Sequence, residues 1–308
     1  MRSIVIIMPY FGKLPVQYKM WRESALRNPT IDFMFFTDTE VEEADNIKVH
    51  KMSFSKFQNI VKNAFDIPVV LDRPYKLCEY KQAYGYILHE YIEEYDFWGF
   101  GDLDLVYGDL RMFLTEEVLK HKLILGWGHL TLLHNDNDTN TYFMKEVPGY
   151  QSYKNAFTTP YITFFDEFNH KGCSDKWRDT RPDDCWLEKP FDNASKPKQS
   201  YHFNSLNHPE WKRVIFEHSG SKLYTIRFIK GRIEKRESLY AHFQHRPFMK
   251  DRVRDYNHFL VTPSSMIDYP VHFTTLWLRF HCRRRCLFTF YYQWKDRIIW
   301  KLGLSKQR

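Results

Sequence analysis

Two aspartates separated by one residue are the feature of this chain that points most directly to chemistry. Asp102 and Asp104 end a hydrophobic run, Tyr95 to Phe100. On an extended backbone, residues two apart point to the same side, so the two carboxylates are expected to converge. Carboxylate oxygens suit hard divalent cations. The spacing therefore predicts a metal site, and the competing interpretation is a pair of solvated loop aspartates.

A histidine late in the chain is a candidate third metal ligand. His242 ends a predicted strand, Ser238 to Phe243, and the segment continues to Arg246. A neutral imidazole can coordinate a metal beside two carboxylates, and an arginine can pair with phosphate. A purely structural histidine remains the alternative interpretation.

Two lysines lie near the start of a predicted helix. Lys76 and Lys81 follow Pro74, and a helix N-terminus together with lysines favours anion binding. A diphosphate held by a metal on one side needs cationic partners on the other. Ordinary lysines on a solvated helix face are the alternative.

Two further segments carry polar groups in aromatic or apolar surroundings. Asp166 and Glu167 lie between phenylalanines, which would raise a carboxyl pKa as a general acid or base requires. A helix cap is the alternative. His129 and Asn135 flank an apolar run and are candidates for hydrogen bonds to sugar hydroxyls, although each also suits a structural role.

The elements that would position these residues alternate between strand and helix patterns. Hydrophobic periodicity predicts strands over 3–8, 32–36 and 46–52, with helices over 15–27 and 54–64. This order is typical of a doubly wound α/β sheet, in which ligands bind beyond the carboxyl ends of the strands. Tyr10, Phe11, Asp38 and the aspartate pair are all predicted to lie at that edge.

The later segments are expected to complete the same domain. The patterns predict helices over 76–95 and 109–120 and a strand over 122–126. Residues 126–200 are rich in Asn, Asp, Thr and Pro, which favours long functional loops. Residues 200–243 contain short alternating runs, read as antiparallel strands that complete the sheet.

Composition limits the class of protein and its compartment. A chain of 308 residues can bury a sizeable core, and 5 scattered cysteines without a Cys-x-x-Cys pair favour free thiols in a reducing compartment. No apolar run is long enough to span a membrane. We therefore expect a cytoplasmic protein.

The positive charge is concentrated at the C-terminus. The net charge is +7, but residues 276–308 contain nine Lys or Arg and one acidic residue, so this segment carries +8 and the rest −1. Arg283–Arg285 precede a helical stripe made of Leu287, Tyr291, Trp294, Ile298 and Leu302. We expect a catalytic domain over 1–274 and a tail over 275–308 that attaches to the inner face of an anionic membrane. A helix packed on the domain is the alternative.

Taken together, the motifs resemble a bacterial family of GT-A-like glycosyltransferases found with polysaccharide and lipopolysaccharide assembly. The resemblance is carried by IVIIMPYFGKLP, DFMFFTDT, PYKLCEYKQAYGYI, YDFWGFGDLDLVYGDL, GHLTLLHN, FDEF and AHFQHR, and covers roughly residues 3–247. More distantly, residues 78–104 look like the sugar-binding region of larger Asp-x-Asp transferases. Glu79 stands where Asp is expected, and Gln82 where Pro is expected.

The resemblance implies a GT-A-like fold, a nucleotide-sugar donor, Mn²⁺ or Mg²⁺, and a saccharide or lipid-linked saccharide acceptor. Asp102 and Asp104 would hold the metal and the donor phosphates, and His242 would match a late histidine ligand. Tyr10, Phe11 and Asp38 would lie where the nucleoside binds, with Lys76 and Lys81 at donor contacts. For an inverting reaction, Asp166 or Glu167 would be the base.

Two other classes of function remain open. A nucleotidyltransferase or phosphodiesterase also pairs aspartates around a metal, and Asp109 could then supply a further acidic ligand. A non-enzymatic nucleic-acid-binding protein would use the basic tail and the aromatics. The positive charge lies in one terminal segment instead of lining a groove, which favours the enzyme and predicts no nucleic-acid partner.

Overall fold

The computed structural model describes residues 1–196, 202–244, 250–283, 291, 294–295 and 298. The chain divides into two compact units, which are described separately. The first unit contains residues 1–14, 28–102 and 111–188, and the second contains 15–27, 103–110 and 189–308.

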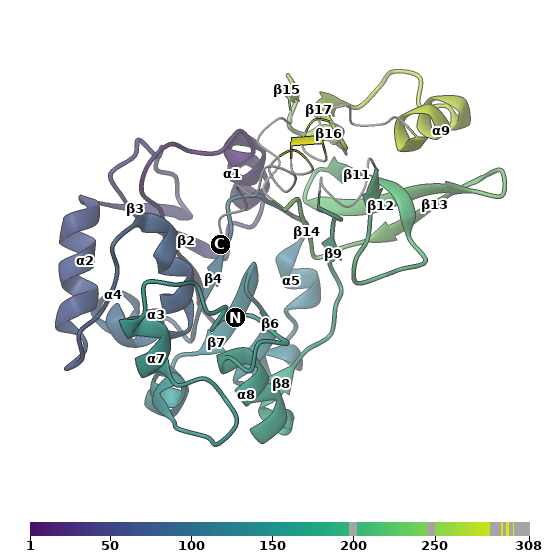
Figure 1. The fold of residues 1–308 in the computed structure, drawn as a ribbon. Helices are drawn as coiled ribbons and strands as arrows, with labels where there is room; N and C mark the ends of the chain where they lie inside the picture. The colour runs from purple at the N-terminus through teal and green to yellow at the C-terminus, as the bar shows by residue number, and fades with distance from the viewer. Residues whose placement is uncertain (197–201, 245–249, 284–290, 292–293, 296–297, 299–308) are drawn as a thin grey trace. The chain divides into compact units, whose positions relative to one another are not determined.

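The first unit is built on a mixed seven-stranded sheet (Figure 1). Its strands, in the order β3-β2-β1-β4-β7-β6-β8, are Ile47–Lys51, Asp32–Thr37, Ile4–Pro9, Phe97–Gly101, Leu130–His134, Leu123–Trp127 and Cys185–Trp186. The first four strands are parallel, and β7 runs antiparallel to both β4 and β6. The α/β class and the strands expected near residues 3–8, 32–36, 46–52 and 122–126 are therefore confirmed.

In the parallel part of this sheet the strand order reverses next to β1, because β2 and β3 lie on one side of β1 and β4 lies on the other. In open α/β sheets, ligands bind at such a switch point, beyond the carboxyl ends of the strands. Ile7 in β1 pairs with Met34 in β2 and with Phe100 in β4. The segments that follow these strands, which begin near Tyr10, Asp38 and Asp102, therefore lie at one edge of the sheet, as the sequence predicts.

Helices cover one face of this sheet through a continuous apolar core. The core joins Val5, Ile7, Phe36, Trp98 and Phe100 of the sheet to residues of α2 (Phe54–Asn63), α3 (Tyr84–Ile87), α4 (His89–Ile92), α7 (Tyr153–Thr158) and α8 (Cys173–Thr180). Burial of these apolar and aromatic side chains stabilises the sheet and so holds the ends of its strands in place.

The helix expected over residues 76–95 is broken into three pieces. It begins as a 3₁₀ helix, η1 (Pro74–Ala83), and continues as the short helices α3 and α4. A 3₁₀ helix has three residues per turn, so residues three apart share a face. Leu77, Tyr80 and Ala83 accordingly form a buried apolar face. The sequence predicts an α-helical period here, and the structure shows a 3₁₀ helix instead.

The remaining elements of the first unit are short. The helix expected over 109–120 is reduced to α5 (Leu110–Phe113), which begins at the unit boundary, and η2 (Val118–Lys120). The segment expected to be irregular contains β7, α7 and α8, together with α6 (Asn137–Thr141), η3 (Tyr142–Met144) and η4 (Pro182–Asp184).

The second unit contains two further sheets. One has the order β13-β12-β11-β16-β17-β15, with β10 paired to β11; these strands are Arg232–Glu237, Lys222–Ile229, Lys212–Ser219, His258–Thr262, Ser265–Asp268 and Lys250–Arg252, and β10 is Phe203–Asn204. The other has the order β5-β14-β9, with strands Leu105–Tyr107, Tyr240–His242 and Asp192–Asn193. The antiparallel strands expected over 200–243 are present, but they form separate sheets and do not complete the first one.

Helices α1 (Tyr18–Leu26) and α9 (Thr275–Arg283) lie in the described part of the second unit. α1 buries Met20 and Trp21, and α9 packs through Leu278. Within the described ranges, no helix combines the length and apolar character needed to cross a bilayer. Cys78, Cys173 and Cys185 are free thiols, as expected for these three.

Candidate metal centre

The two aspartates lie at the turn that joins β4 to β5. Asp102 follows β4, and its backbone N–H donates to the carbonyl of His129 at 3.1 Å. Leu103 and Asp104 form the turn before β5 begins at Leu105. The carboxylates therefore converge at a turn, whereas the sequence predicts an extended strand at this point. Because one residue separates them, the chain itself keeps both within reach of a single ion.

His242 reaches Asp104 through strand pairing within the second unit. His242 ends β14, which pairs antiparallel with β5 so that His242 faces Leu105, and the Phe243 N–H donates to the Asp104 carbonyl at 3.0 Å. The imidazole Nε2 lies 3.4 Å from Asp104 Oδ1, and both side chains are buried. Strand pairing thus places the imidazole of His242 beside the carboxylate of Asp104, which lies 138 residues earlier in the chain (242 − 104).

A neighbouring amide orients the His242 ring. β14 also pairs with β9, which brings Asn193 opposite His242, and the ring Nδ1 lies 3.2 Å from Asn193 Oδ1. The Gln244 amide nitrogen also lies 3.4 Å from Nδ1, but the Asn193 oxygen is nearer and only accepts, so we assign the ring proton to Nδ1. The Gln244 amide also donates to Asn193 Oδ1, which supports this orientation of the amide. In the neutral ring, Nε2 is then the nitrogen with a lone pair, and it faces Asp104.

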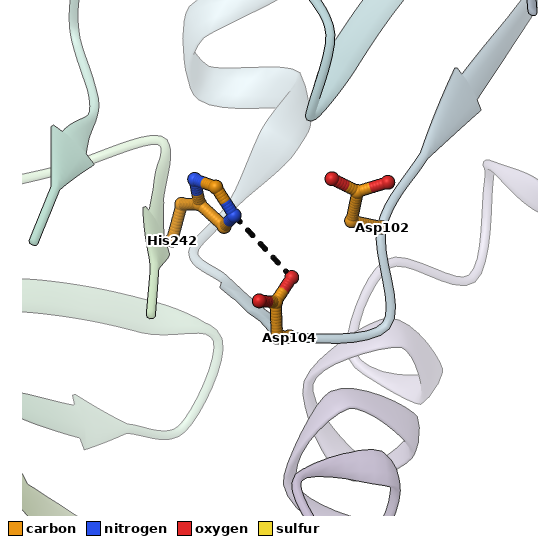
Figure 2. A group of neighbouring side chains, drawn as sticks. All are labelled: Asp102, Asp104 and His242. Carbon is orange, nitrogen blue, oxygen red and sulfur yellow. Dashed lines mark ion pairs between the residues drawn. The ribbon is translucent and has the colours of Figure 1, made fainter. Parts of the chain in front are cut away.

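These residues form a compact group of potential metal ligands. One ligand atom each from Asp102, Asp104 and His242 lies within 4.8 Å of the others (Figure 2). Figure 2 shows the His242 ring facing the Asp104 carboxylate, with the Asp102 side chain beside them. Two carboxylates and one neutral imidazole are compatible with a divalent cation such as Mn²⁺. The donor set fits the metal expected from the sequence.

Lys81 places a positive charge beside Asp102. Its ammonium donates to Asp102 Oδ1 at 2.8 Å and to the Gly128 carbonyl at 2.7 Å, and it lies 3.7 Å from Asp166 Oδ2. Burial alone lowers the pKa of Lys81, but Asp102 and Asp166 outweigh it and raise that pKa. Lys81 therefore stays charged and links the two carboxylates.

Asp166 has the environment expected of a general base. Its side chain is buried, and this burial raises its pKa to about 7, against the opposing effect of Lys81. The Asp166 carboxylate lies close to the backbone of Gly128, where an added Cβ would be 3.0 Å from Asp166 Oδ2. Glu167, the other predicted candidate, is exposed to solvent.

One face of η1 holds the loop that carries Asp166. Lys76, Glu79 and Gln82 recur every three residues and are all buried. The Lys76 ammonium donates to the carbonyls of Ala156 and Tyr161, Glu79 accepts the N–H groups of Thr163 and Phe164, and Gln82 donates to Ser174. The structure thus places Lys76, a predicted donor contact, inside the protein with a structural function. Lys81 lies on a different face and points to the carboxylates.

The residues expected near the nucleoside lie at the predicted edge but differ in exposure. Asp38 is exposed and accepts the Gly12 N–H at 3.1 Å, and the Tyr10 hydroxyl donates to the Lys13 carbonyl. Phe11 is buried against Phe54 and Phe57. Tyr10 and Asp38 therefore remain available candidates, whereas Phe11 belongs to the core.

The two predicted acceptor contacts lie at opposite ends of β7. His129 precedes that strand, beside Asp102, and its ring stacks with Trp127. Asn135 follows the strand, and its amide donates to the carbonyls of Ile92 and Tyr95. Since β4 and β7 are antiparallel, Asn135 lies near the start of β4 and away from Asp102, so it is a structural residue. Arg246 lies outside the described residues.

The sequence matches the model of a protein family over most of its length. The chain belongs to DUF6625, a family of unknown function, whose model matches residues 6–270. This range contains the candidate metal ligands together with Lys81 and Asp166, and ends before α9. No curated protein matches the chain.

Proposed function

We propose that this protein is a metal-dependent glycosyltransferase of GT-A-like fold that uses a nucleotide-sugar donor. The observation that carries the proposal is the convergence of Asp102, Asp104 and His242 on one point. Asp102 follows β4, next to the change of strand order between β1 and β4, where α/β sheets bind nucleotides. The resemblance of the sequence motifs to GT-A-like enzymes agrees with this assignment.

The residues around the turn would each have a different function in the reaction. A divalent cation held there would neutralise the charge that builds on the nucleoside diphosphate as its bond to the sugar breaks. Tyr10 and Asp38 lie at the same sheet edge and would contact the nucleoside. Lys81 would orient Asp102 through their 2.8 Å contact and offer positive charge to the phosphates.

Asp166 would serve an inverting reaction. A base with a pKa of about 7 is half deprotonated near neutral pH, which suits removal of a proton from an acceptor hydroxyl. Its contact with Lys81 keeps it close to Asp102. A retaining reaction requires no such base, so the effect of Asp166→Asn on rate distinguishes the two stereochemical outcomes.

The proposal is tested by presenting UDP-, GDP- and CMP-sugars with Mn²⁺ and measuring the melting temperature. A true donor should raise the melting temperature only when Mn²⁺ is present, because ligands that bind the folded state stabilise it. The stabilising donor is then incubated with saccharide acceptors, and the products are analysed. Release of the free nucleoside diphosphate supports sugar transfer, whereas release of pyrophosphate would identify a nucleotidyltransferase and contradict the proposal.

A further inference from the structure

One side of α9 is fixed to the second unit. Leu278 is fully buried in a cluster with Ile215, Ile226 and Leu260. Trp277 packs beside it, with its ring stacked on His281 at 3.6 Å between centroids and 5.5 Å from Phe273. The orientation of the helix about its own axis is therefore set by packing on β11 and β12.

The opposite side of α9 presents apolar groups to solvent. Leu276 is 74% exposed and Phe280 is 61% exposed. Residues four apart lie next to each other on a helix, so these two side chains form one apolar surface. Arg279, three residues after Leu276, is also exposed on this side. We call Leu276, Arg279 and Phe280 the outward face of α9.

The charge of the surrounding sequence indicates what this face contacts. Residues 276–308 contain nine basic residues and one acidic residue, whereas the rest of the chain carries −1. Beyond α9 in this segment, the described aromatic residues Tyr291 and Trp294 are 54% and 59% exposed. Apolar and aromatic groups beside an excess of Lys and Arg suit an anionic lipid surface, where the apolar groups enter the acyl boundary and the cations meet phosphate.

We propose that the outward face of α9 binds the surface of an anionic membrane. Nucleic acid would also attract the basic residues, and its bases can stack on an aromatic ring, but it would gain little from the exposed aliphatic side chain of Leu276. The inference concerns where the protein acts and is independent of the proposed sugar transfer. A lipid-linked acceptor would be reached at the same surface.

The test is sedimentation of the full-length protein with lipid vesicles, in the absence of metal and donor. Vesicles of phosphatidylcholine are compared with vesicles that also contain phosphatidylglycerol. We expect binding only to the anionic vesicles, with affinity that falls as salt is raised. The double variant Leu276→Ser/Phe280→Ser should bind about tenfold more weakly or worse. Arg279→Glu should also weaken binding.

A matched control uses an exposed apolar residue elsewhere in the second unit. Leu206 is 45% exposed, and Leu206→Ser should leave vesicle binding unchanged. An unchanged melting temperature for all variants establishes that they fold. The inference is overturned if the wild-type protein ignores lipid charge, if the double variant binds as well as wild type, if RNA competes fully with vesicles, or if the double variant instead converts a dimer to a monomer. None of these results depends on sugar transfer.

Discussion

Asn193 and His242 lie side by side across the pairing of β9 with β14, with the amide oxygen accepting from the ring Nδ1 at 3.2 Å. This contact fixes which ring nitrogen faces Asp104. It therefore makes Asn193 a positioning residue for the candidate metal centre, although it is not one of the three potential ligands.

Replacement of Asn193 by Leu should weaken Mn²⁺ binding by about 10- to 100-fold, which is typical when the partner of a metal-binding histidine is lost. Asn193→Asp keeps an acceptor and should retain most of the affinity. Calorimetric titration measures the affinity, and ¹⁵N shifts of the metal-free protein report the tautomer. Equal Mn²⁺ affinity in Asn193→Leu and wild type would argue against this function of Asn193.

Asp104→Asn should abolish stabilisation by Mn²⁺ and reduce sugar transfer by about 10²-fold or more, because transition-state charge would lose its counterion. Asp109→Asn provides the matched control, since Asp109 lies five residues away but is not in the ligand group. Initial rates at saturating donor measure the effect. If Asp109→Asn were the more damaging change, the phosphodiesterase or nucleotidyltransferase hypothesis would gain support.

Lys81→Met should lower the free energy of unfolding by about 2–3 kcal/mol. The change leaves Asp102 and Asp166 without their shared cation, and the partial exposure of Lys81 and Asp102 reduces the cost below that of a fully buried pair. Lys51→Met removes an exposed ion pair with Glu40 and should cost at most about 1 kcal/mol. Urea denaturation of the two variants measures the difference, and similar losses would contradict a specific contribution from Lys81.

Ionisation of Asp166 should lower the free energy of unfolding as pH rises. Its folded pKa of about 7 lies above the ordinary value, so its contribution is complete below pH ~4 and is lost as pH approaches 7. Asp166→Asn removes this dependence, which amounts to up to about 4 kcal/mol. Unfolding free energies measured at pH 4 and pH 7 should therefore differ less in Asp166→Asn than in wild type. An identical difference in both proteins would show that Asp166 titrates normally.

The sequence predicts the strands and helices that frame the candidate site because their residues have strong local patterns. Ile4–Met8 and Phe33–Phe36 are continuous apolar runs that suit buried parallel strands. The aspartates were identifiable because charged residues end such a run, and His242 because it ends a later one. Each of these signals depends only on neighbouring residues.

The features that the sequence did not predict depend on long-range pairing. Asn193 lies 49 residues from His242, and nothing in its local sequence indicates that β9 will pair with β14. Likewise, alternation identifies antiparallel strands but not the sheet they join. For η1 the sequence does carry a signal, since the apolar residues Leu77, Tyr80 and Ala83 recur every three residues, which is the period of a 3₁₀ helix and not of an α-helix.

The most direct test is an X-ray diffraction measurement on crystals soaked in Mn²⁺, with data collected to reveal the anomalous signal of manganese. We predict one strong peak within coordinating distance of Asp102, Asp104 and the Nε2 of His242. A peak at another site, or none in crystals that retain these three side chains in place, would contradict a metal-dependent reaction at this turn.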